Sequence, residues 1–352
     1  MIDNTVMKTF SKNLLQWYAV NKRDLPWRKT RNPYFIWLSE IILQQTRVAQ
    51  GLEYYLRFVE RFPTLSDLAC ASQDEVLKLW QGLGYYSRAR NLHQAAKQMN
   101  GIFPTSYKEV LALKGVGAYT AAAICSISYN MPYAVVDGNV YRVLSRVFAI
   151  KLPVDSAAGK KKIALLAQDL LDKDSAGDYN QAIMDLGAMI CTPQSPSCTQ
   201  CPLVSCCQAY KQGKQELFPI KKKVAKVSSR YFHYVYVEQG GYTWLFKRET
   251  GDIWANLYEP LLIETEGDLK EPSALLNVPS YKDLLGTRIS NKIVSPVKHI
   301  LSHRVIYADL YHIKIPPSAP IPENAFRVEK KKISTYPVSR LVQKLLEKAG
   351  YL

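Results

Sequence analysis

Four cysteines gathered in a seventeen-residue loop constrain this chain more than any other feature. They are Cys191, Cys198, Cys201 and Cys207, separated by six, two and five residues. Thiolates so close together can hold a [4Fe–4S] cluster without a distant ligand. Zinc is the structural rival, because it also takes four cysteines. The spacing predicts a metal-bound loop and favours iron–sulfur over zinc, with Cys207 rather than its neighbour Cys206 as the expected fourth ligand.

The composition indicates a globular protein with a polyanionic partner. The chain has 352 residues, enough for two or three domains, and a hydrophobic content of 47%. Its net charge of +16 favours nucleic acid first and an acidic membrane surface second, although lysines added for solubility would give the same charge. Residues 1–12 lack the apolar core of a signal peptide, and no apolar run approaches the ~20 residues that a membrane span needs. We therefore expect a cytosolic protein, in which clustered cysteines are metal ligands before disulfides.

The first two-thirds of the chain is expected to be all helical. Val6, Phe10, Leu14 and Trp17 recur at helical spacing, and Asn32-Pro33 has the pattern of an N-cap that begins a helix running to about Gln45. No convincing strand precedes residue 220. Further helices are predicted at 50–61, 73–80, 87–99, 107–113, 118–129, 138–149, 158–172 and 176–190.

The texture of the sequence changes after a basic run at Lys221–Lys223 and Lys226, which suits a linker. Aromatic and β-branched residues then predict strands at 231–238, 242–247 and 307–315, with Gly240-Gly241 as a hairpin turn between the first two. An amphipathic helix at 338–349 closes the chain. The fold class is therefore mainly α, with a separate α/β domain at the C-terminus.

Two glycines mark a candidate phosphate site. Gly115 and Gly117 lie between two predicted helices, where they permit a tight turn and a close backbone approach. The second helix presents free N–H groups at its start, so the site suits a DNA phosphate, or a cation shared between backbone carbonyls and a phosphate. Many helix connections contain glycine, so this motif gains meaning only beside the others.

Two acidic residues are candidates for chemistry. Glu40 lies on a helix among apolar residues, so desolvation should raise its pKa and favour the protonated acid that a proton donor needs. A solvated glutamate beside an apolar stripe is the alternative. Asp137 precedes a helical run and has the pattern of an N-cap, a role compatible with turning one oxygen toward a substrate.

Together these motifs resemble the helix-hairpin-helix, iron–sulfur DNA glycosylase superfamily, and within it the adenine DNA glycosylases. The resemblance runs from about residue 10 to 210 and persists more weakly in the C-terminal domain. Besides the cysteines and the hairpin, it rests on Leu25–Arg28, Trp37–Glu40, Leu43–Val48, Gln81–Arg90 and Val135–Val140.

The resemblance implies a domain plan. Residues 1–220 would form the glycosylase core, with a six-helix module at about 30–136 and an iron–sulfur module made of the N-terminal helix and 137–210. Residues 221–228 would be the linker, and 229–352 a Nudix-like domain that recognises 8-oxoguanine. The glutamate-rich metal-binding helix of a Nudix hydrolase is missing after 251–259, so this domain should bind rather than hydrolyse.

The resemblance also implies an activity. The enzyme would flip adenine out of the duplex, protonate its N7 from Glu40 and stabilise the oxocarbenium ion with Asp137. Tyr119 and Asn139 would orient the two carboxylates and the attacking water. Bifunctional relatives carry a nucleophilic lysine where this chain has Tyr119, which indicates a monofunctional glycosylase.

The remaining implied roles concern DNA. Gln45 and Tyr85 would wedge into the base stack beside 8-oxoguanine, and Arg28 and Gln44 would frame the adenine pocket. The partner would be double-stranded DNA with adenine:8-oxoguanine or adenine:guanine mispairs, bound by a monomer in the bacterial cytoplasm. An endonuclease III-like glycosylase/lyase and a non-catalytic iron–sulfur DNA-binding protein are the alternatives. Ser302 and His303 would contact the lesion, and the chain departs from the family pattern at Leu301, Lys114 and Tyr141.

Overall fold

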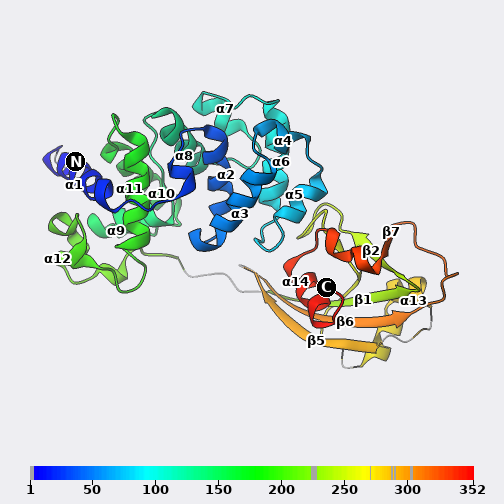
Figure 1. The fold of residues 1–352 in the computed structure, drawn as a ribbon. Coiled ribbons are helices and arrows are strands. Elements are labelled where there is room, and N and C mark those ends of the chain that lie inside the picture. The colour runs from blue at the N-terminus through cyan, green and yellow to red at the C-terminus, as the bar shows by residue number, and fades with distance from the viewer. Residues whose placement is uncertain (1–3, 223–227, 270, 287, 289–290, 302–303) are drawn as a thin grey trace. The chain divides into compact units, whose positions relative to one another are not determined.

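The computed structural model describes residues 4–222, 228–269, 271–286, 288, 291–301 and 304–352 (Figure 1). The chain divides into two compact units: Met1–Ala69 with Gln94–Lys223, and Cys70–His93 with Val224–Leu352. Within the described residues, no helix is both long and apolar enough to cross a membrane. Lys223 and Lys226 of the predicted linker lie outside the described residues.

The first unit is helical, as predicted. Every strand that the structure describes begins at or beyond Ser228. Helix α6 (Ser87–Met99) begins in the second unit and ends in the first. The helices of the first unit are α1 (Asn4–Asn21), α2 (Pro33–Leu43), α3 (Val48–Arg61), α4 (Leu65–Cys70), α7 (Tyr107–Ala112), α8 (Ala118–Tyr129), α9 (Gly138–Val147), α10 (Ala157–Leu170), α11 (Ala176–Met189) and α12 (Gln208–Lys211).

Local signals fix the ends of the helices that carry the site. Asn32 caps α2 by accepting a hydrogen bond of 3.0 Å from the Tyr34 N–H, with Pro33 at the first helical position. Helix α8 is buried along Thr120–Ile127 and packs against α2 and α11, which makes it the central helix of this unit. Its position explains why its first turn can reach residues on both neighbours.

The second unit is built on a seven-stranded sheet in the order β3-β2-β1-β6-β5, with β4 paired to β1 and β7 paired to β2. The long strands β1 and β6 run parallel from Ser228↔Arg304 to Glu238↔Lys314. The hairpin predicted at Gly240-Gly241 is confirmed, because Glu238 pairs with Thr243 across it. The strands are β1 (Ser228–Gln239), β2 (Tyr242–Lys247), β3 (Tyr258–Glu259), β4 (Leu261–Thr265), β5 (Asn291–Ile300), β6 (Arg304–Lys314) and β7 (Ala325–Glu329).

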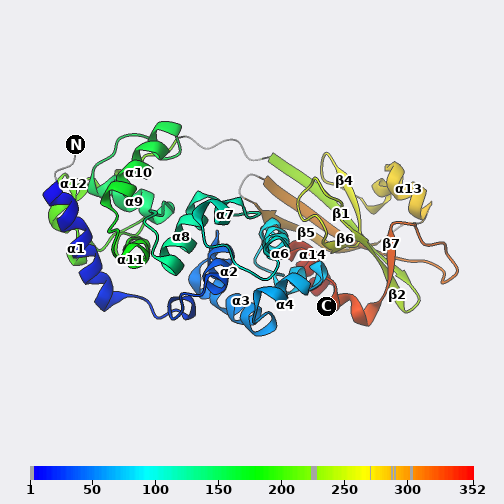
Figure 2. The ribbon, with the colours of Figure 1, turned by 90° about the horizontal axis from the view of Figure 1, so that it is seen from above.

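Two helices cover opposite faces of this sheet (Figure 2). On one face, Val235 and Val237 of β1 share a core with Tyr281 and Leu285 of α13 (Pro279–Leu285). Alternate side chains of a strand point to opposite faces, so Tyr236 points the other way. There the sheet packs against α14 (Arg340–Lys348), the closing helix predicted from the sequence.

Residues 70–93, predicted as part of the helical core, pack with the sheet. Asp74, in helix α5 (Gln73–Leu79), accepts hydrogen bonds of 2.9 Å from both Lys247 and Tyr258. Arg90 donates a bond of 2.8 Å to the Ala255 carbonyl. These polar contacts explain why this segment belongs to the second compact unit. The domain bounds given above remain a prediction.

Candidate active site

The site begins where the last turn of α2 meets the first turn of α8. The Tyr119 hydroxyl donates a hydrogen bond of 2.8 Å to Oε2 of Glu40. The same hydroxyl lies 3.3 Å from the Met184 sulfur of α11. A phenol and a carboxyl group that the sequence separates by 79 positions therefore form one unit.

The surroundings of Glu40 favour its protonated form. Although the residue keeps some solvent exposure, desolvation is the largest influence on its pKa and raises it to about 7. The hydrogen bond from Tyr119 lowers the pKa, the charge of Asp137 raises it, and Arg28 lowers it. A carboxyl group with a pKa near neutrality can donate a proton at physiological pH. The burial expected from the apolar neighbours of Glu40 is therefore the main cause of its raised pKa.

Asp137 caps α9, as its position before a helical run predicted. Its Oδ1 accepts a hydrogen bond of 2.8 Å from the Val140 N–H, and its Oδ2 accepts one of 2.7 Å from the Asn139 side chain. Burial raises the pKa of Asp137, and these two hydrogen bonds oppose the rise. The capping bond fixes one oxygen, so the side chain cannot rotate freely.

Asn139 is held in turn by residues that the sequence analysis did not single out. Arg142 donates a hydrogen bond of 2.8 Å to the Asn139 side-chain oxygen and another of 2.6 Å to the Cys191 carbonyl. Gly187 of α11 allows this packing, because a Cβ there would lie 2.5 Å from the Cβ of Asn139. Hydrogen bonds thus link Asp137, Asn139, Arg142 and the backbone of the cysteine loop.

The segment that leads into Asp137 is clamped from two helices. Asn180 of α11 is fully buried. It donates a hydrogen bond of 2.8 Å to the Tyr133 carbonyl and accepts one of 3.1 Å from the Val135 N–H. Gln168 of α10 donates a hydrogen bond of 2.8 Å to the Pro132 carbonyl and accepts one of 3.1 Å from the Ala134 N–H. Two amide side chains therefore satisfy four backbone groups of an irregular segment.

Arg28 lies in a buried ion cluster with a residue that the sequence analysis missed. Asp185 of α11 has no exposed surface. It accepts a hydrogen bond of 2.6 Å from Arg28 and one of 2.8 Å from Arg23. Burial alone would raise the pKa of Asp185, but the bonds from Arg28 and Arg23 hold it below its ordinary value. Gln44, the other residue expected to frame the pocket, donates 3.3 Å to Thr120 on α8.

The glycine hairpin joins α7 to α8 as predicted. Gly115 has a φ of +78°, a left-handed conformation that favours glycine. Gly117 is the N-cap of α8, and a Cβ built there would meet no atom within 4 Å. The hairpin thus leaves space for a ligand to approach its backbone closely.

The two residues expected to wedge into DNA share an unusual backbone. Gln45 has a φ of 59° and Tyr85 a φ of 47°, both left-handed and uncommon outside glycine. Such strain clusters at functional sites. Tyr85 is also 50% exposed, although it is a large aromatic residue. The two residues lie in different compact units.

The four predicted ligands, Cys191, Cys198, Cys201 and Cys207, line one small cavity with Arg146, whose Nη1 lies 3.3 Å from the Cys191 sulfur. Cys206 does not line this cavity and donates instead to the Leu203 carbonyl at 3.2 Å. In the part of the chain that the structure describes, no three acidic, histidine or cysteine residues are arranged as a metal site. The donors nevertheless fit a thiolate-bound group, since four sulfurs and a buried guanidinium surround one space.

The second unit has a cavity of about 1300 Å³ that Tyr85, Trp254 and His299 line together with Leu301. The Trp254 and His299 rings meet edge to face at 5.6 Å. Ser302 and His303, the expected lesion contacts, lie outside the described residues. The structure therefore brings Tyr85 to the same cavity as His299 and Leu301, which lie just before Ser302 in the sequence.

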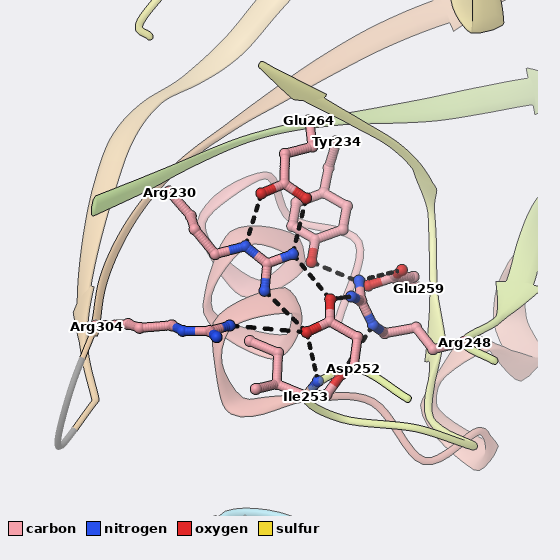
Figure 3. A network of polar contacts seen from close by, with 8 residues as sticks. All are labelled: Arg230, Tyr234, Arg248, Asp252, Ile253, Glu259, Glu264 and Arg304. Carbon is pink, nitrogen blue, oxygen red and sulfur yellow. Dashed lines mark hydrogen bonds and ion pairs between the residues drawn. The ribbon is translucent and has the colours of Figure 1, made fainter. Parts of the chain in front are cut away.

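A network of arginines and carboxylates surrounds Asp252, one of the residues that line that cavity (Figure 3). Arg230 donates 2.8 Å to Asp252 and 2.6 Å to Glu264. Arg248 donates 2.7 Å to Asp252 and 2.7 Å to Glu259. Burial raises the pKa of Glu259 to about 7 despite the opposing charge of Arg248. Each carboxylate has an arginine partner, and Asp252 is held next to Trp254.

Comparisons with known families agree with both halves of this description. The profile of the HhH-GPD superfamily of base excision DNA repair proteins matches residues 38–171. The profile of the NUDIX domain matches residues 233–348. The predicted fold class, a helical core followed by a Nudix-like domain, is confirmed.

Several relatives carry the same name. An adenine DNA glycosylase of Buchnera aphidicola subsp. Baizongia pistaciae (strain Bp) is 35% identical over 308 residues, which cover 85% of this chain and 84% of that protein. One from Buchnera aphidicola subsp. Schizaphis graminum (strain Sg) is 37% identical over 254 residues, covering 71% and 73%. One from Rattus norvegicus is 46% identical over 226 residues, covering 60% of this chain but only 44% of the relative's length.

Solved structures resemble the helical part. A thermostable thymine-DNA glycosylase matches with a TM-score of 0.55 and 30% identity, over 59% of this chain and 98% of that one. Endonuclease III in a non-covalent complex with DNA matches with a TM-score of 0.51 and 22% identity, over 60% and 99%. The second likeness shows the fold alone.

Proposed function

The chain belongs to the family of adenine DNA glycosylases, and from this membership we propose that it removes adenine mispaired with 8-oxoguanine or guanine from double-stranded DNA. The release of the base would initiate base excision repair. The observation that carries the proposal is the partly buried Glu40, whose pKa of about 7 and bond from Tyr119 suit a proton donor. The match covers only 44% of the length of the rat relative. The proposed activity therefore rests on the residues of this chain.

Glu40 supplies the proton in this scheme. Adenine is extruded from the duplex, at a cost of a few kcal/mol of unstacking. The protonated Glu40 gives its proton to N7, which turns adenine into a neutral leaving group. Tyr119 keeps the carboxyl oriented through its hydrogen bond of 2.8 Å. Protonation by this acid is effective at neutral pH because burial raises its pKa to about 7.

Asp137 stabilises the positive charge that develops on the sugar as the glycosidic bond breaks. One of its oxygens is fixed by Val140, and Asn139 binds the other at 2.7 Å. Arg142 and Gly187 hold Asn139 in place, so the carboxylate does not need to reorganise during the reaction. A water that adds to the sugar then completes the hydrolysis, with Asn139 and Tyr119 as the groups that orient it.

Tyr119 decides between the two modes of glycosylase chemistry. A lysine amine can attack the sugar carbon and form an imine, which leads to strand cleavage. A phenol cannot form an imine, and this phenol is engaged with Glu40. The chain is therefore a monofunctional glycosylase in this proposal.

The cysteine loop would hold a [4Fe–4S] cluster through Cys191, Cys198, Cys201 and Cys207. Bound there, the cluster would crosslink the loop and supply no atom to the reaction. Arg146 is buried and donates 2.7 Å to the Thr192 carbonyl, so it fastens the start of the loop. Arg142 continues this support to Asn139.

The second unit would recognise the 8-oxoguanine of the opposite strand with the cavity that Tyr85 and Trp254 line. Asp252, Glu259 and Glu264 are all paired with arginines. A hydrolase would need free carboxylates to hold Mg²⁺ against a pyrophosphate. The pairing therefore supports a binding role for this unit, with Ser302 and His303 as the proposed polar contacts.

A panel of defined duplexes tests the proposal. We expect adenine release from adenine:8-oxoguanine and adenine:guanine duplexes, and no release from an adenine:thymine duplex. Glu40→Gln should abolish release and leave duplex binding largely intact, because glutamine keeps the shape but has no proton to give. Release by Glu40→Gln at a rate near that of the wild type would refute the assigned acid. Strand nicking without added base would favour the lyase alternative.

A further inference from the structure

A groove lies beside the proposed catalytic residues in the first unit. Tyr119, which binds Glu40, lines it together with Ala118, the first residue after the glycine hairpin. Val136 lines it next to Asp137. The groove therefore connects the hairpin and both carboxyl-bearing segments to a surface that the proposed mechanism does not use. We call it the α8–α10 groove, after two of the helices that line it.

Its lining combines aromatic and basic side chains. Tyr107 and Tyr133 stack with their ring centroids 4.0 Å apart, and Tyr141 also lines the groove. Lys160 and Lys161 of α10 line it too, and both are exposed. No acidic residue is among the described residues that line it.

The walls of the groove are built to stay in place. Gln168 binds both the Pro132 carbonyl and the Ala134 N–H, at 2.8 Å and 3.1 Å. Asn180 holds the Tyr133 carbonyl at 2.8 Å from a fully buried position. The tyrosine wall is therefore anchored to α10 and α11 rather than formed by a free loop.

Tyrosine faces beside exposed ammonium groups suit one ligand chemistry. Lysines neutralise phosphates, and aromatic faces accept sugars or bases without regard to sequence. Tyr119 and Val136 line the groove next to the carboxyl groups proposed to act on the flipped nucleotide, so the strand that carries this nucleotide is the one that can continue into it. Lys160 and Lys161 pair with no carboxylate within the described part of the chain, and their charge is available to a phosphate.

We propose that the α8–α10 groove binds the phosphodiester backbone of the adenine-containing strand on one side of the excised base, with Lys160 and Lys161 as the phosphate contacts. The inference rests on the proposed function, because it assumes that the adenine strand enters the site at Tyr119. It adds a strand-specific contact surface beyond the glycine hairpin.

The test pairs a protein variant with a change in the DNA. The variant is Lys160→Gln/Lys161→Gln, and the matched control is Lys8→Gln/Lys12→Gln, which removes two exposed lysines from α1. The duplex carries a 2′-fluorinated target nucleotide, which resists cleavage, so that binding is measured alone. Neutral methylphosphonate linkages are then placed at single positions along either strand.

The wild type and the control should lose affinity when linkages on one side of the adenine are neutralised. The Lys160→Gln/Lys161→Gln protein should bind roughly 5-fold or more weakly, with a salt slope smaller by about 2, and should lose nothing further at those linkages. Neutral linkages in the opposite strand should weaken all three proteins equally.

The inference would be overturned if the lysine substitutions and the neutral linkages weakened binding additively at every linkage. Equal losses of affinity for the Lys160→Gln/Lys161→Gln variant and the Lys8→Gln/Lys12→Gln control would also overturn it. So would a variant whose unfolding temperature matches the wild type and whose binding is unchanged. Adenine release is measured separately on a cleavable duplex. A wild-type protein that binds the duplex but releases no adenine would contradict the proposed function. Additive effects of the lysine substitutions and the neutral linkages would contradict only the proposed role of the α8–α10 groove.

Discussion

The Tyr119 hydroxyl donates a hydrogen bond of 2.8 Å to Glu40, and this bond lowers the pKa of a carboxyl group that burial raises to about 7. Two opposing influences therefore set the acid strength of Glu40. Desolvation raises the pKa of Glu40, and the hydrogen bond from the phenol opposes part of that rise. The pair places the proton donor near the pH at which a cell works.

We expect the rate of adenine release to fall as the pH rises through about 7. The pKa of Glu40 is raised from its ordinary value, so the active protonated form is present below about 7 and is lost above it. Well above the pKa, each further pH unit should lower the single-turnover rate about tenfold. A rate profile between pH 5 and 9, measured at saturating enzyme, checks this. A profile that stays flat across neutral pH would contradict the role of Glu40 as the acid.

Tyr119→Phe should move the descending limb of that profile to higher pH. The hydrogen bond from Tyr119 lowers the pKa of Glu40, so its removal raises the pKa further. The maximal rate should also fall, because the carboxyl loses the partner that orients it. Tyr129→Phe is the matched control, since that hydroxyl also belongs to α8 but binds the Pro104 carbonyl at 3.2 Å. An unshifted limb in Tyr119→Phe would show that the bond does not tune the acid.

Local signals in the sequence predicted those parts of the fold that are decided within a few residues. The Asn32-Pro33 start of α2, the Asp137 cap and the Gly240-Gly241 turn are all of this kind. Strand β5 was not predicted, because Pro296 and exposed polar residues interrupt its pattern and its pairing with β6 shifts in register. The parallel pairing of β1 with β6 joins distant segments and has no local signature.

The same distinction applies to the site. Glu40, Tyr119 and Asp137 were found from motifs, and the structure shows Glu40 and Tyr119 in contact. The residues that hold the site in place were missed, because their partners are far away in the sequence. Asp185 binds Arg28 across 157 positions, and no pattern near either residue indicates this. Only the packing of α11 against the rest of the unit brings them together.

Asp185→Asn should destabilise the protein by about 3–5 kcal/mol, because it leaves two arginines near a buried site without their counter-charge. Asp185 has no exposed surface and binds Arg23 and Arg28. Asp24→Asn is the control, since its ion pair with Lys29 lies at the surface and should contribute less than about 1 kcal/mol. Denaturant unfolding of both variants measures the difference. Equal midpoints for the two would show that the buried cluster adds no stability.

Cys207→Ser should remove the bound metal, whereas Cys206→Ser should retain it. Cys207 lines the cavity with the other three thiols, while Cys206 donates to the Leu203 carbonyl at 3.2 Å. Visible absorbance and the iron and zinc content of the purified protein are the measurements. A loss of absorbance in Cys206→Ser would exchange the roles of the two residues. Zinc in place of iron would overturn the proposed cluster but keep the four ligands.

Gly187→Ala should impair the reaction without unfolding the protein. A Cβ at this position would lie 2.5 Å from the Cβ and 3.1 Å from the Cα of Asn139, so Asn139 and its bond to Asp137 must shift. Because a displacement of about 1 Å at a reacting group can cost about 100-fold in rate, we expect a loss of that order in single-turnover release.

Gly241→Ala is the matched control for Gly187→Ala, because a Cβ there meets no atom within 4 Å. The unfolding temperature of each variant separates a local shift from a loss of the fold. If Gly187→Ala released adenine as fast as Gly241→Ala, the position of Asn139 would not govern the reaction. A slow Gly187→Ala protein with an unchanged unfolding temperature would instead tie the rate to the contact between α11 and the start of α9.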